Sequence, residues 1–255
     1  MKKALTTLAL AMAAAAASMS AQAGVLRTTI NFEAPIDASP FLSYPGSNLL
    51  GSGDEFYQAG LAGRTMYFSP FSNSASAVAG DLVGFMGNGS DASTCWSITC
   101  PSNNPSTYLG LLDDAVMVMG STDGFRFSVK NFKASFISNG DPIAAIPGYV
   151  RLQGIRNGAS TIATFALTGL DANGALNFGT INTGTFGNIE FDYVYAYGFA
   201  CPTPGVAGSC SAFSTDRAQF ALDDITIEHV PEPASLALVS LAGLAAAGAR
   251  RRRAA

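Results

Sequence analysis

Apolar and polar residues alternate in short segments along most of the chain, and the clearest example is residues 124–136. The apolar side chains there occupy every second position in two successive phases, first Phe125, Phe127 and Val129, then Phe132, Ala134 and Phe136. A period of two is typical of a half-buried β-strand. The change of phase after Lys130-Asn131 predicts a β-bulge or a tight turn within this segment.

Other segments with strand-like patterns predict further strands on both sides of it. They cover residues 26–34, 64–69, 149–156, 160–168, 175–181, 188–198 and 219–229, and residues 112–119 are predicted as a buried strand. Asn157-Gly158 predicts a hairpin turn, because this dipeptide accepts the positive φ angles that such turns require. Residues 73–106 are rich in Gly, Ser and Asn and are predicted to be mostly loop.

The sequence predicts an all-β protein, because no stretch of residues 24–228 combines helix caps with an apolar stripe of helical period. Many short strands separated by glycine-rich turns are typical of an antiparallel β-sandwich, and we expect one of the jelly-roll type. A propeller or solenoid would require an internal repeat, which the sequence lacks. The predicted domain covers residues 24–228, between two terminal segments of different character.

The N-terminal segment, residues 1–23, has the features of a secretory signal peptide. Lys2 and Lys3 precede an apolar stretch at 4–17, and Ala21-Gln22-Ala23 supplies the small residues of a cleavage site. We therefore expect export by the Sec route, with signal peptidase cutting before Gly24.

The C-terminal segment, residues 229–255, carries three features in a fixed order. Pro231, Glu232 and Pro233 come first, an uncharged run at 234–249 follows, and four consecutive arginines come last, Arg250, Arg251, Arg252 and Arg253. The run is short for a membrane span, which needs about 20 residues, but the arginines favour a short transmembrane helix with its basic end in the cytoplasm. This order resembles the PEP-CTERM sorting signal of Gram-negative bacteria.

The resemblance implies that an exosortase, a multi-spanning membrane enzyme, recognises Pro231, Glu232 and Pro233 and removes the tail. The protein would be held transiently in the inner membrane, then placed at the cell surface or in the extracellular matrix. Bacteria with this system typically make exopolysaccharide and biofilm matrix, so exopolysaccharide or matrix proteins are the expected partners. The resemblance covers only the tail and leaves the activity of the domain open.

Charge excludes one class of partner for the exported part. Residues 24–232 hold eight basic and eighteen acidic side chains, a net charge of −10. Nucleic-acid binding requires a basic face, so we expect no nucleic-acid partner. Cations, neutral sugars and other proteins fit this charge better.

The four cysteines lie in the exported part as two close pairs, Cys95 with Cys100 and Cys201 with Cys210. An oxidising compartment favours disulfides, and each spacing closes a short loop. Four cysteines permit three pairings, of which we prefer the one with two local bridges. A zinc site is disfavoured, because His229 is the only histidine and no CxxC spacing is present.

The chain offers little for catalysis. His229 ends the last predicted strand without a neighbouring nucleophile motif, which disfavours Ser-His-Asp, Cys-His and histidine-ligated metal mechanisms. Paired carboxylates of the kind that hydrolyse glycosides occur at Asp54-Glu55, Asp113-Asp114 and Asp223-Asp224, but acids are frequent in this chain. We expect a protein that is not an enzyme, with a secreted glycoside hydrolase as the distant alternative.

The two aspartates of the last predicted strand require a partner. Asp223 and Asp224 are adjacent within an alternating segment, so one of them must lie among apolar neighbours. An ionised carboxylate in that position needs a counter-charge or hydrogen bonds, and a cation is a common partner. The alternative is that the aspartates cap a strand or meet Arg126 or Arg217.

Two resemblances involve the same strand. Gln219, Phe220 and Asp223 form a Gln-Phe-x-x-Asp stretch similar to the end of several PEP-CTERM cargo proteins. Phe32-Glu33 near the mature start, together with Leu222-Asp223-Asp224-Ile225, resembles jelly-roll carbohydrate-binding modules, in which the corresponding strands often share a structural calcium. This second resemblance implies that Glu33 and Asp223 are calcium ligands.

Aromatic side chains are the candidate sugar contacts. Tyr193, Tyr195 and Tyr197 alternate along one predicted strand and therefore share a face. They can stack on pyranose rings or form a wall of the core, and the core role is favoured. Trp96, the only tryptophan, lies inside the Cys95 to Cys100 loop, where it either contacts a ligand or fills a gap beneath the loop.

These features together predict a secreted β-sandwich with a structural or adhesive role in exopolysaccharide or biofilm. The alternative from a different class is a carbohydrate-binding module for one defined glycan. The two differ in whether binding depends on particular aromatic side chains.

Overall fold

The computed structural model describes residues 24–33, 49–89, 95 and 98–230, and Arg27–His229 form a compact unit. The predicted signal peptide at 1–23 and the sorting segment from residue 231 onward lie outside the described residues. In the described ranges the helical elements are two single-turn 3-10 helices, η2 (Leu61–Gly63) and η4 (Phe186–Asn188), so the all-β prediction is confirmed. Neither is long enough to cross a membrane, and the span predicted at 234–249 is not among the residues described.

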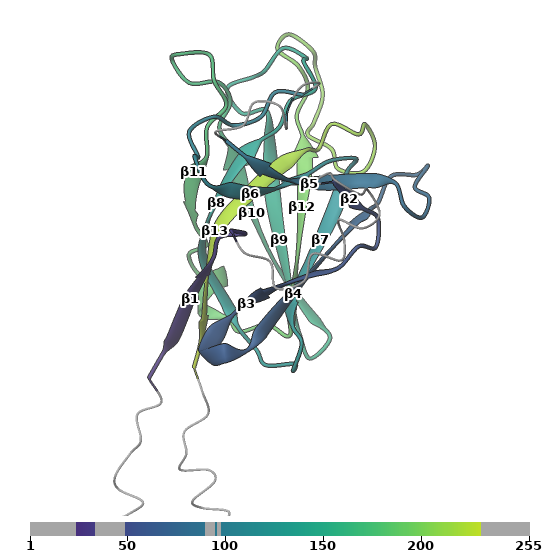
Figure 1. Cartoon of the computed structure of the whole chain (residues 1–255). Coiled ribbons are helices and arrows are strands. Elements are labelled where there is room, and N and C mark those ends of the chain that lie inside the picture. Colours follow the sequence, from purple (N-terminus) through teal and green to yellow (C-terminus); the bar gives the residue numbers. More distant parts are fainter. Residues whose placement is uncertain (1–23, 34–48, 90–94, 96–97, 231–255) are drawn as a thin grey trace, which may run out of the picture. The chain divides into compact units, whose positions relative to one another are not determined.

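Two antiparallel sheets build the unit (Figure 1). The first sheet has the order β11-β8-β13-β6-β5-β2, and β1 pairs with β13 beside this path. Its strands are β1 (Leu26–Ile30), β2 (Leu49–Gly51), β5 (Leu82–Asn88), β6 (Thr107–Leu111), β8 (Ser128–Phe136), β11 (Gly179–Asn182) and β13 (Phe220–His229). The long strand β13 therefore lies inside the sheet, with β8 on one side and β6 and β1 on the other.

The second sheet has the order β10-β9-β12-β7-β4-β3. Its strands are β3 (Phe56–Ala59), β4 (Thr65–Ser72), β7 (Ala115–Ser121), β9 (Gly148–Arg156), β10 (Ala159–Leu167) and β12 (Tyr193–Ala200). The central strand β12 pairs with β9 on one side and with β7 on the other.

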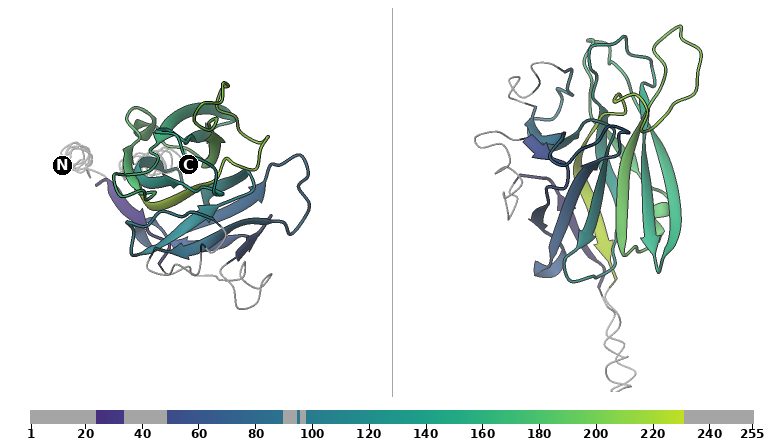
Figure 2. Two further views of the ribbon diagram at one scale, coloured as in Figure 1. Left: turned by 90° about the horizontal axis from the view of Figure 1, so that it is seen from above. Right: turned by 90° about the vertical axis from the view of Figure 1, so that its right-hand side faces the viewer.

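The inner faces of the two sheets pack against each other, and Figure 2 shows the two layers from the end. Phe132 on β8 meets Phe165 on β10 with ring centroids 5.7 Å apart. A small gap between the layers is lined from both sides, by Met119 and Val194 of one sheet and by Leu222 of the other. Each fully buried apolar side chain contributes about 1.5–3 kcal/mol, which is why the alternating pattern specifies this arrangement.

The predicted β-bulge is present in β8. Thr226 of β13 pairs with Asn131 and Ile227 pairs with Val129, so Lys130 is the extra residue. The apolar residues before and after the bulge are all buried, as the change of phase requires.

A second bulge, in β13, separates the two adjacent aspartates. Asp224 has φ 46°, and the pairing with β8 shifts register between Asp223 and Thr226. Asp223 is fully buried, whereas Asp224 lies at the surface with its carboxylate 2.7 Å from Lys133 Nζ. The prediction that one aspartate lies among apolar neighbours is confirmed.

The hairpin predicted at Asn157-Gly158 joins β9 to β10. Asn157 has φ 51° and Gly158 has φ 77°, the two positive angles of a type I′ turn. Arg156 pairs directly with Ala159, and the ladder continues without a register shift to the end of β10.

The prediction that residues 73–106 are mostly loop misses strand β5. Gly84 and Gly87 suggested a loop, but they are needed because neighbouring strands approach closely. A Cβ at Gly84 would lie 2.5 Å from the carbonyl oxygen of Gly110, and one at Gly87 would overlap the ring of Tyr108. Glycine can therefore occur inside a strand where no side chain fits.

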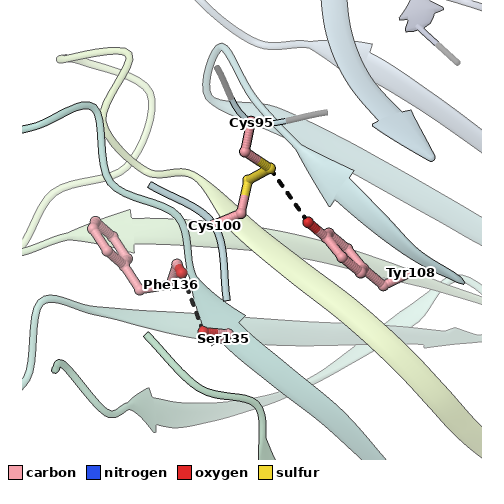
Figure 3. Close-up of a disulfide and its surroundings, with 5 residues drawn as sticks. All are labelled: Cys95, Cys100, Tyr108, Ser135 and Phe136. Atoms are coloured by element: carbon pink, nitrogen blue, oxygen red, sulfur yellow. Dashed lines mark hydrogen bonds between the residues drawn. A yellow bond between two sulfur atoms is a disulfide. The ribbon is translucent and has the colours of Figure 1, made fainter. Parts of the chain in front are cut away.

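Both predicted local disulfides form, Cys95–Cys100 with an S–S distance of 2.04 Å and Cys201–Cys210 with 1.99 Å. Beside the first of them, the hydroxyl of the buried Tyr108 lies 3.5 Å from Cys95 Sγ (Figure 3). Burial raises the pKa of Tyr108 to about 12, so this hydroxyl stays protonated at neutral pH.

Candidate functional site

The outer face of the six-stranded sheet carries the tyrosines that were predicted as core. Val194 and Ala196 of β12 point inward and are buried, while Tyr193, Tyr195 and Tyr197 point outward and are partly exposed. The preference for a core role was wrong, because both sets alternate and either face of β12 could have been the inner one. The structure brings the three predicted glycan contacts together on the solvent side.

Cross-strand pairing extends this surface across the sheet, because directly paired residues share a face. Tyr193 pairs with Gly120, which pairs in turn with Tyr67, and Tyr67 pairs with Tyr57. These residues form one row across four strands.

The neighbouring rows run parallel to the first. Tyr195 lies between Val118 on β7 and Gln153 on β9. Tyr197 lies between Val116 and Arg151. Three further aromatic residues complete the rows: Phe71 lies opposite Val116, and Tyr149 and Phe199 lie opposite each other.

We call this surface the aromatic face. It consists of Tyr57, Tyr67, Phe71, Tyr149, Tyr193, Tyr195, Tyr197 and Phe199, all of them partly exposed. Six of the eight tyrosines of the chain lie on it. The solvent side of an antiparallel sheet is ordinarily polar, so a concentration of rings there indicates a contact surface.

The rings of the aromatic face are held by one another. Tyr193 and Tyr195 meet edge to face with centroids 5.4 Å apart, and Tyr197 lies 5.8 Å from Phe199. The guanidinium of Arg151 lies over the Phe199 ring at 4.4 Å, a cation–π arrangement. These contacts fix the orientation of the rings.

Polar groups lie between the rings. Arg151 Nε donates to Thr164 Oγ1 at 2.9 Å, and Gln153 Nε2 donates to Ser160 Oγ at 3.1 Å. The Tyr197 hydroxyl lies 3.4 Å from the other amide atom of Gln153, its acceptor Oε1. Hydrogen-bonding groups are therefore positioned beside apolar ring surfaces.

The hydroxyls of Tyr67 and Tyr195 remain protonated at neutral pH. Burial raises the pKa of Tyr195, and the neighbouring Tyr193 raises it further. Burial also raises the pKa of Tyr67, with Glu55 as the next cause. These hydroxyls can thus donate as well as accept hydrogen bonds.

Gly120 has a specific role in this surface. A Cβ at this position would lie 2.4 Å from the Tyr67 hydroxyl oxygen and 2.5 Å from its ring carbons. The ring of Tyr67 therefore lies directly over the backbone of Gly120, where any side chain would displace it.

Trp96, the remaining predicted sugar contact, lies outside the described residues. The ends of its loop are described, and Thr99 pairs with Ser138 by two backbone hydrogen bonds of 2.7 and 3.0 Å. The loop is thus attached to the region just after β8.

Asp223, predicted as a calcium ligand, is held by hydrogen bonds from three donors. Asn104 Nδ2 donates to Oδ2 at 2.6 Å and Ser106 Oγ to the same oxygen at 3.2 Å, while the Asp224 amide donates to Oδ1 at 2.7 Å. Burial nevertheless raises the pKa of Asp223, because these bonds only partly offset the loss of solvent. Arg126 and Arg217 do not meet either aspartate and bind Asp192 and Asp141 instead.

Glu33, the second predicted calcium ligand, contacts the same segment. Its carboxylate accepts from the Thr107 amide at 2.7 Å and from Thr107 Oγ1 at 3.2 Å. Since Ser106 binds Asp223 and Thr107 binds Glu33, both carboxylates contact the same two-residue stretch. The oxygens of this region are hard ligands of the class that calcium takes.

The described residues contain no group of three or more His, Cys, Asp or Glu side chains arranged to hold a metal ion. A calcium ion near Glu33 and Asp223 would therefore take most of its ligands from neutral oxygens, such as those of Asn104, Ser106 and Thr107. Hydroxyl and carbonyl oxygens are acceptable calcium ligands, so the donor set fits in kind.

One acid from each of two carboxylate pairs considered for hydrolysis holds local structure. Asp114 is buried and accepts hydrogen bonds from the amides of Thr215, Asp216 and Ala218 at 3.1–3.3 Å. Asp54 accepts from the Gly51 amide at 2.6 Å. These acids fix loops and strand ends.

His229 also has structural partners. Its Nδ1 lies 3.2 Å from Glu190 Oε1, and its ring meets Phe125 edge to face at 5.3 Å. It holds the end of β13 against the domain, just before the sorting motif.

The domain and the tail together define an exported β-sandwich protein with a terminal sorting signal. The family model of the PEP-CTERM protein-sorting motif matches residues 229–253, which confirms the resemblance seen in the sequence. The tail is thus a membrane-anchoring sorting signal that directs the exported protein to exosortase processing. A comparison with curated proteins found no match to the chain.

Proposed function

We propose that the exported protein binds polysaccharide of the cell surface or extracellular matrix through the aromatic face, and that this binding gives it a structural or adhesive role. The observation that carries the proposal is the presence of six of the eight tyrosines on the solvent side of one sheet. Partly exposed rings offer flat apolar surfaces to the C–H faces of sugar rings. Gln153, Arg151 and the tyrosine hydroxyls supply hydrogen bonds beside them.

The charge of the aromatic face indicates the kind of polysaccharide. Arg151 is the only charged side chain at the paired outward positions of the six strands, all of which the structure describes. One acid, Glu55, lies at the margin of the face and accepts a hydrogen bond from the Tyr57 hydroxyl. A neutral or sparsely acidic sugar chain fits such a surface. The rows cross several strands of an open sheet, which suits a polymer better than a small ligand.

The test is equilibrium binding of the exported protein to exopolysaccharide purified from the producing strain. We expect saturable binding for the unaltered protein and a loss of about tenfold or more in affinity for Tyr195→Ala, as for a central contact residue. Tyr195→Phe keeps the ring and should retain most of the affinity if stacking dominates.

The matched control is Val206→Ala, which removes an exposed apolar side chain outside the aromatic face. It should bind as the unaltered protein does, and all variants should keep the same melting temperature within a few degrees. Equal binding by Tyr195→Ala and Val206→Ala would exclude the aromatic face as the polysaccharide-binding surface. Binding confined to one glycan in a panel would favour a specific carbohydrate-binding module, and release of reducing ends would favour a hydrolase.

The strand order supports the finer assignment to a jelly-roll type of sandwich, which we also propose. Consecutive strands from β6 to β9 alternate between the two sheets, and β12 and β13 again lie in different ones. Such alternation is expected when strands cross repeatedly from one layer to the other.

A structural calcium ion held near Glu33 and Asp223 is a further proposal. If calcium binds there, adding excess chelator to the exported protein should lower its melting temperature by several degrees, and added calcium should restore it. Glu33→Gln should reduce this calcium-dependent difference. A melting curve that is the same with chelator and with calcium would show that no calcium ion stabilises the fold.

A further inference from the structure

The sheets differ in how their edges are protected, and β10 has an unusual edge. It is nine residues long, whereas the other edge strands, β1, β2, β3 and β11, have five, three, four and four residues. Short edge strands are one way in which proteins avoid pairing with other chains. The edge formed by β10 lacks this protection.

The backbone groups that face outward from β10 follow from the hairpin. In a type I′ turn the Arg156 carbonyl accepts a hydrogen bond from the Ala159 amide, so Ala159 faces β9. The direction alternates in an antiparallel ladder, and the outward backbone groups therefore belong to Ser160, Ile162, Thr164 and Ala166. Within the described part of the chain, no backbone hydrogen bond outside the ladder reaches residues 160–166.

The side chains of β10 supply none of the usual protection either. The sequence of the strand, Ala-Ser-Thr-Ile-Ala-Thr-Phe-Ala-Leu, contains no charge and no proline, and its register with β9 is unbroken by a bulge. Ile162 is 52% exposed beside this open edge. A lysine, a proline or a β-bulge would be expected if this edge strand had to remain unpaired.

We propose that β10 is a self-association surface, at which a second copy of this chain adds its own β10 in antiparallel orientation. A two-fold axis at Ala163 places Ile162 opposite Thr164 of the second copy and Ser160 opposite its Ala166. This register pairs outward-facing backbone groups with one another and forms about eight hydrogen bonds across the interface. The two six-stranded sheets become continuous.

Charge explains why the second copy binds here. The exported part has a net charge of −10, so two copies repel each other over most of their surfaces. The uncharged β10 edge allows close approach without placing acidic groups opposite each other. An antiparallel strand edge is also self-complementary under a two-fold axis, which a heterologous partner would not require.

The two aromatic faces would then lie on one continuous sheet, which doubles the number of strands that the face crosses. This consequence rests on the proposed polysaccharide binding, but the self-association does not. A protein with defective sugar binding should still associate, so the two proposals can fail separately.

The test is sedimentation velocity of the exported protein over a range of concentrations. The unaltered protein should show a dimer whose proportion rises with concentration, and Ile162→Lys should raise the dimer dissociation constant at least about tenfold, because edge lysines oppose strand pairing. The matched control is Thr180→Lys, which places the same charge on the exposed part of another edge strand, β11, and should leave the dimer unchanged.

A cysteine cross-link tests the register. Ala163→Cys should form a disulfide with the same introduced cysteine of the second copy in the oxidising compartment reached during export. Opposed Cα atoms at a non-hydrogen-bonded pair are about 4.5 Å apart, which suits a disulfide. Ala172→Cys, in an exposed turn, is the control and should cross-link far less. A monomer at all concentrations, a dimer unaffected by Ile162→Lys, or equal cross-linking at the two cysteines would overturn the proposal.

Discussion

Replacing Asp223 by alanine should reduce the free energy of unfolding by about 3 kcal/mol, more than a hundredfold in the ratio of folded to unfolded protein. The side chain is fully buried, and its oxygens accept hydrogen bonds from Asn104, Ser106 and the Asp224 amide. Its removal leaves the Asn104 amide, itself 3% exposed, without this acceptor. Urea-induced unfolding of the oxidised, exported protein measures the change.

The neighbouring aspartate provides the control. Asp224→Asn keeps a side chain that tolerates the positive φ of the bulge and removes only a surface ion pair with Lys133. We expect it to cost less than about 1 kcal/mol. Similar losses for the two variants would mean that the hydrogen-bonded position of Asp223 has no special importance.

Replacing the sorting motif should stop release of the protein. With Pro231, Glu232 and Pro233 all changed to alanine, the exosortase loses its recognition sequence, and most of the protein should remain in the membrane fraction with its tail attached. The released form of the unaltered protein should lack peptides from 236–250. Intact-mass and peptide mass spectrometry of the two fractions distinguish these products.

Val230→Ala is the matched control, because Val230 lies just outside the motif and is 51% exposed. It should be released as the unaltered protein is. The folded domain ends only two residues before the motif, since β13 ends at His229. If the triple variant were released at the normal rate and without its tail, the assignment of these residues as the recognition sequence would be wrong.

Local patterns predicted nine of the thirteen strands of the described residues, the bulge in β8 and the hairpin at Asn157-Gly158, because each depends on a short stretch of sequence. The short strands β2, β3 and β6 were not predicted. Strand β5 was missed because its glycines reflect contacts with Gly110 and Tyr108, which are distant in the chain. No local pattern contains that information.

In the candidate site, too, the sequence predicted local features and missed those that depend on contacts distant in the chain. The alternation of Tyr193, Tyr195 and Tyr197 correctly predicted a shared face, but the sequence could not tell whether that face is inward or outward. Tyr67 and Gly120 join them only through strand pairing, and no spacing in the sequence connects these positions. Asp223 was identified because an acid in an apolar strand conflicts with its surroundings, whereas its partners Asn104 and Ser106 had no such signal.

The most direct measurement of the central claim is hydroxyl-radical footprinting of the exported protein, read by mass spectrometry, with and without the producing strain's exopolysaccharide. We predict that labelling of Tyr193, Tyr195 and Tyr197 falls when polysaccharide is bound. The exposed apolar residues Ile146 and Val206, outside the aromatic face, should be labelled as before. Unchanged labelling of the three tyrosines under saturating polysaccharide would contradict the account.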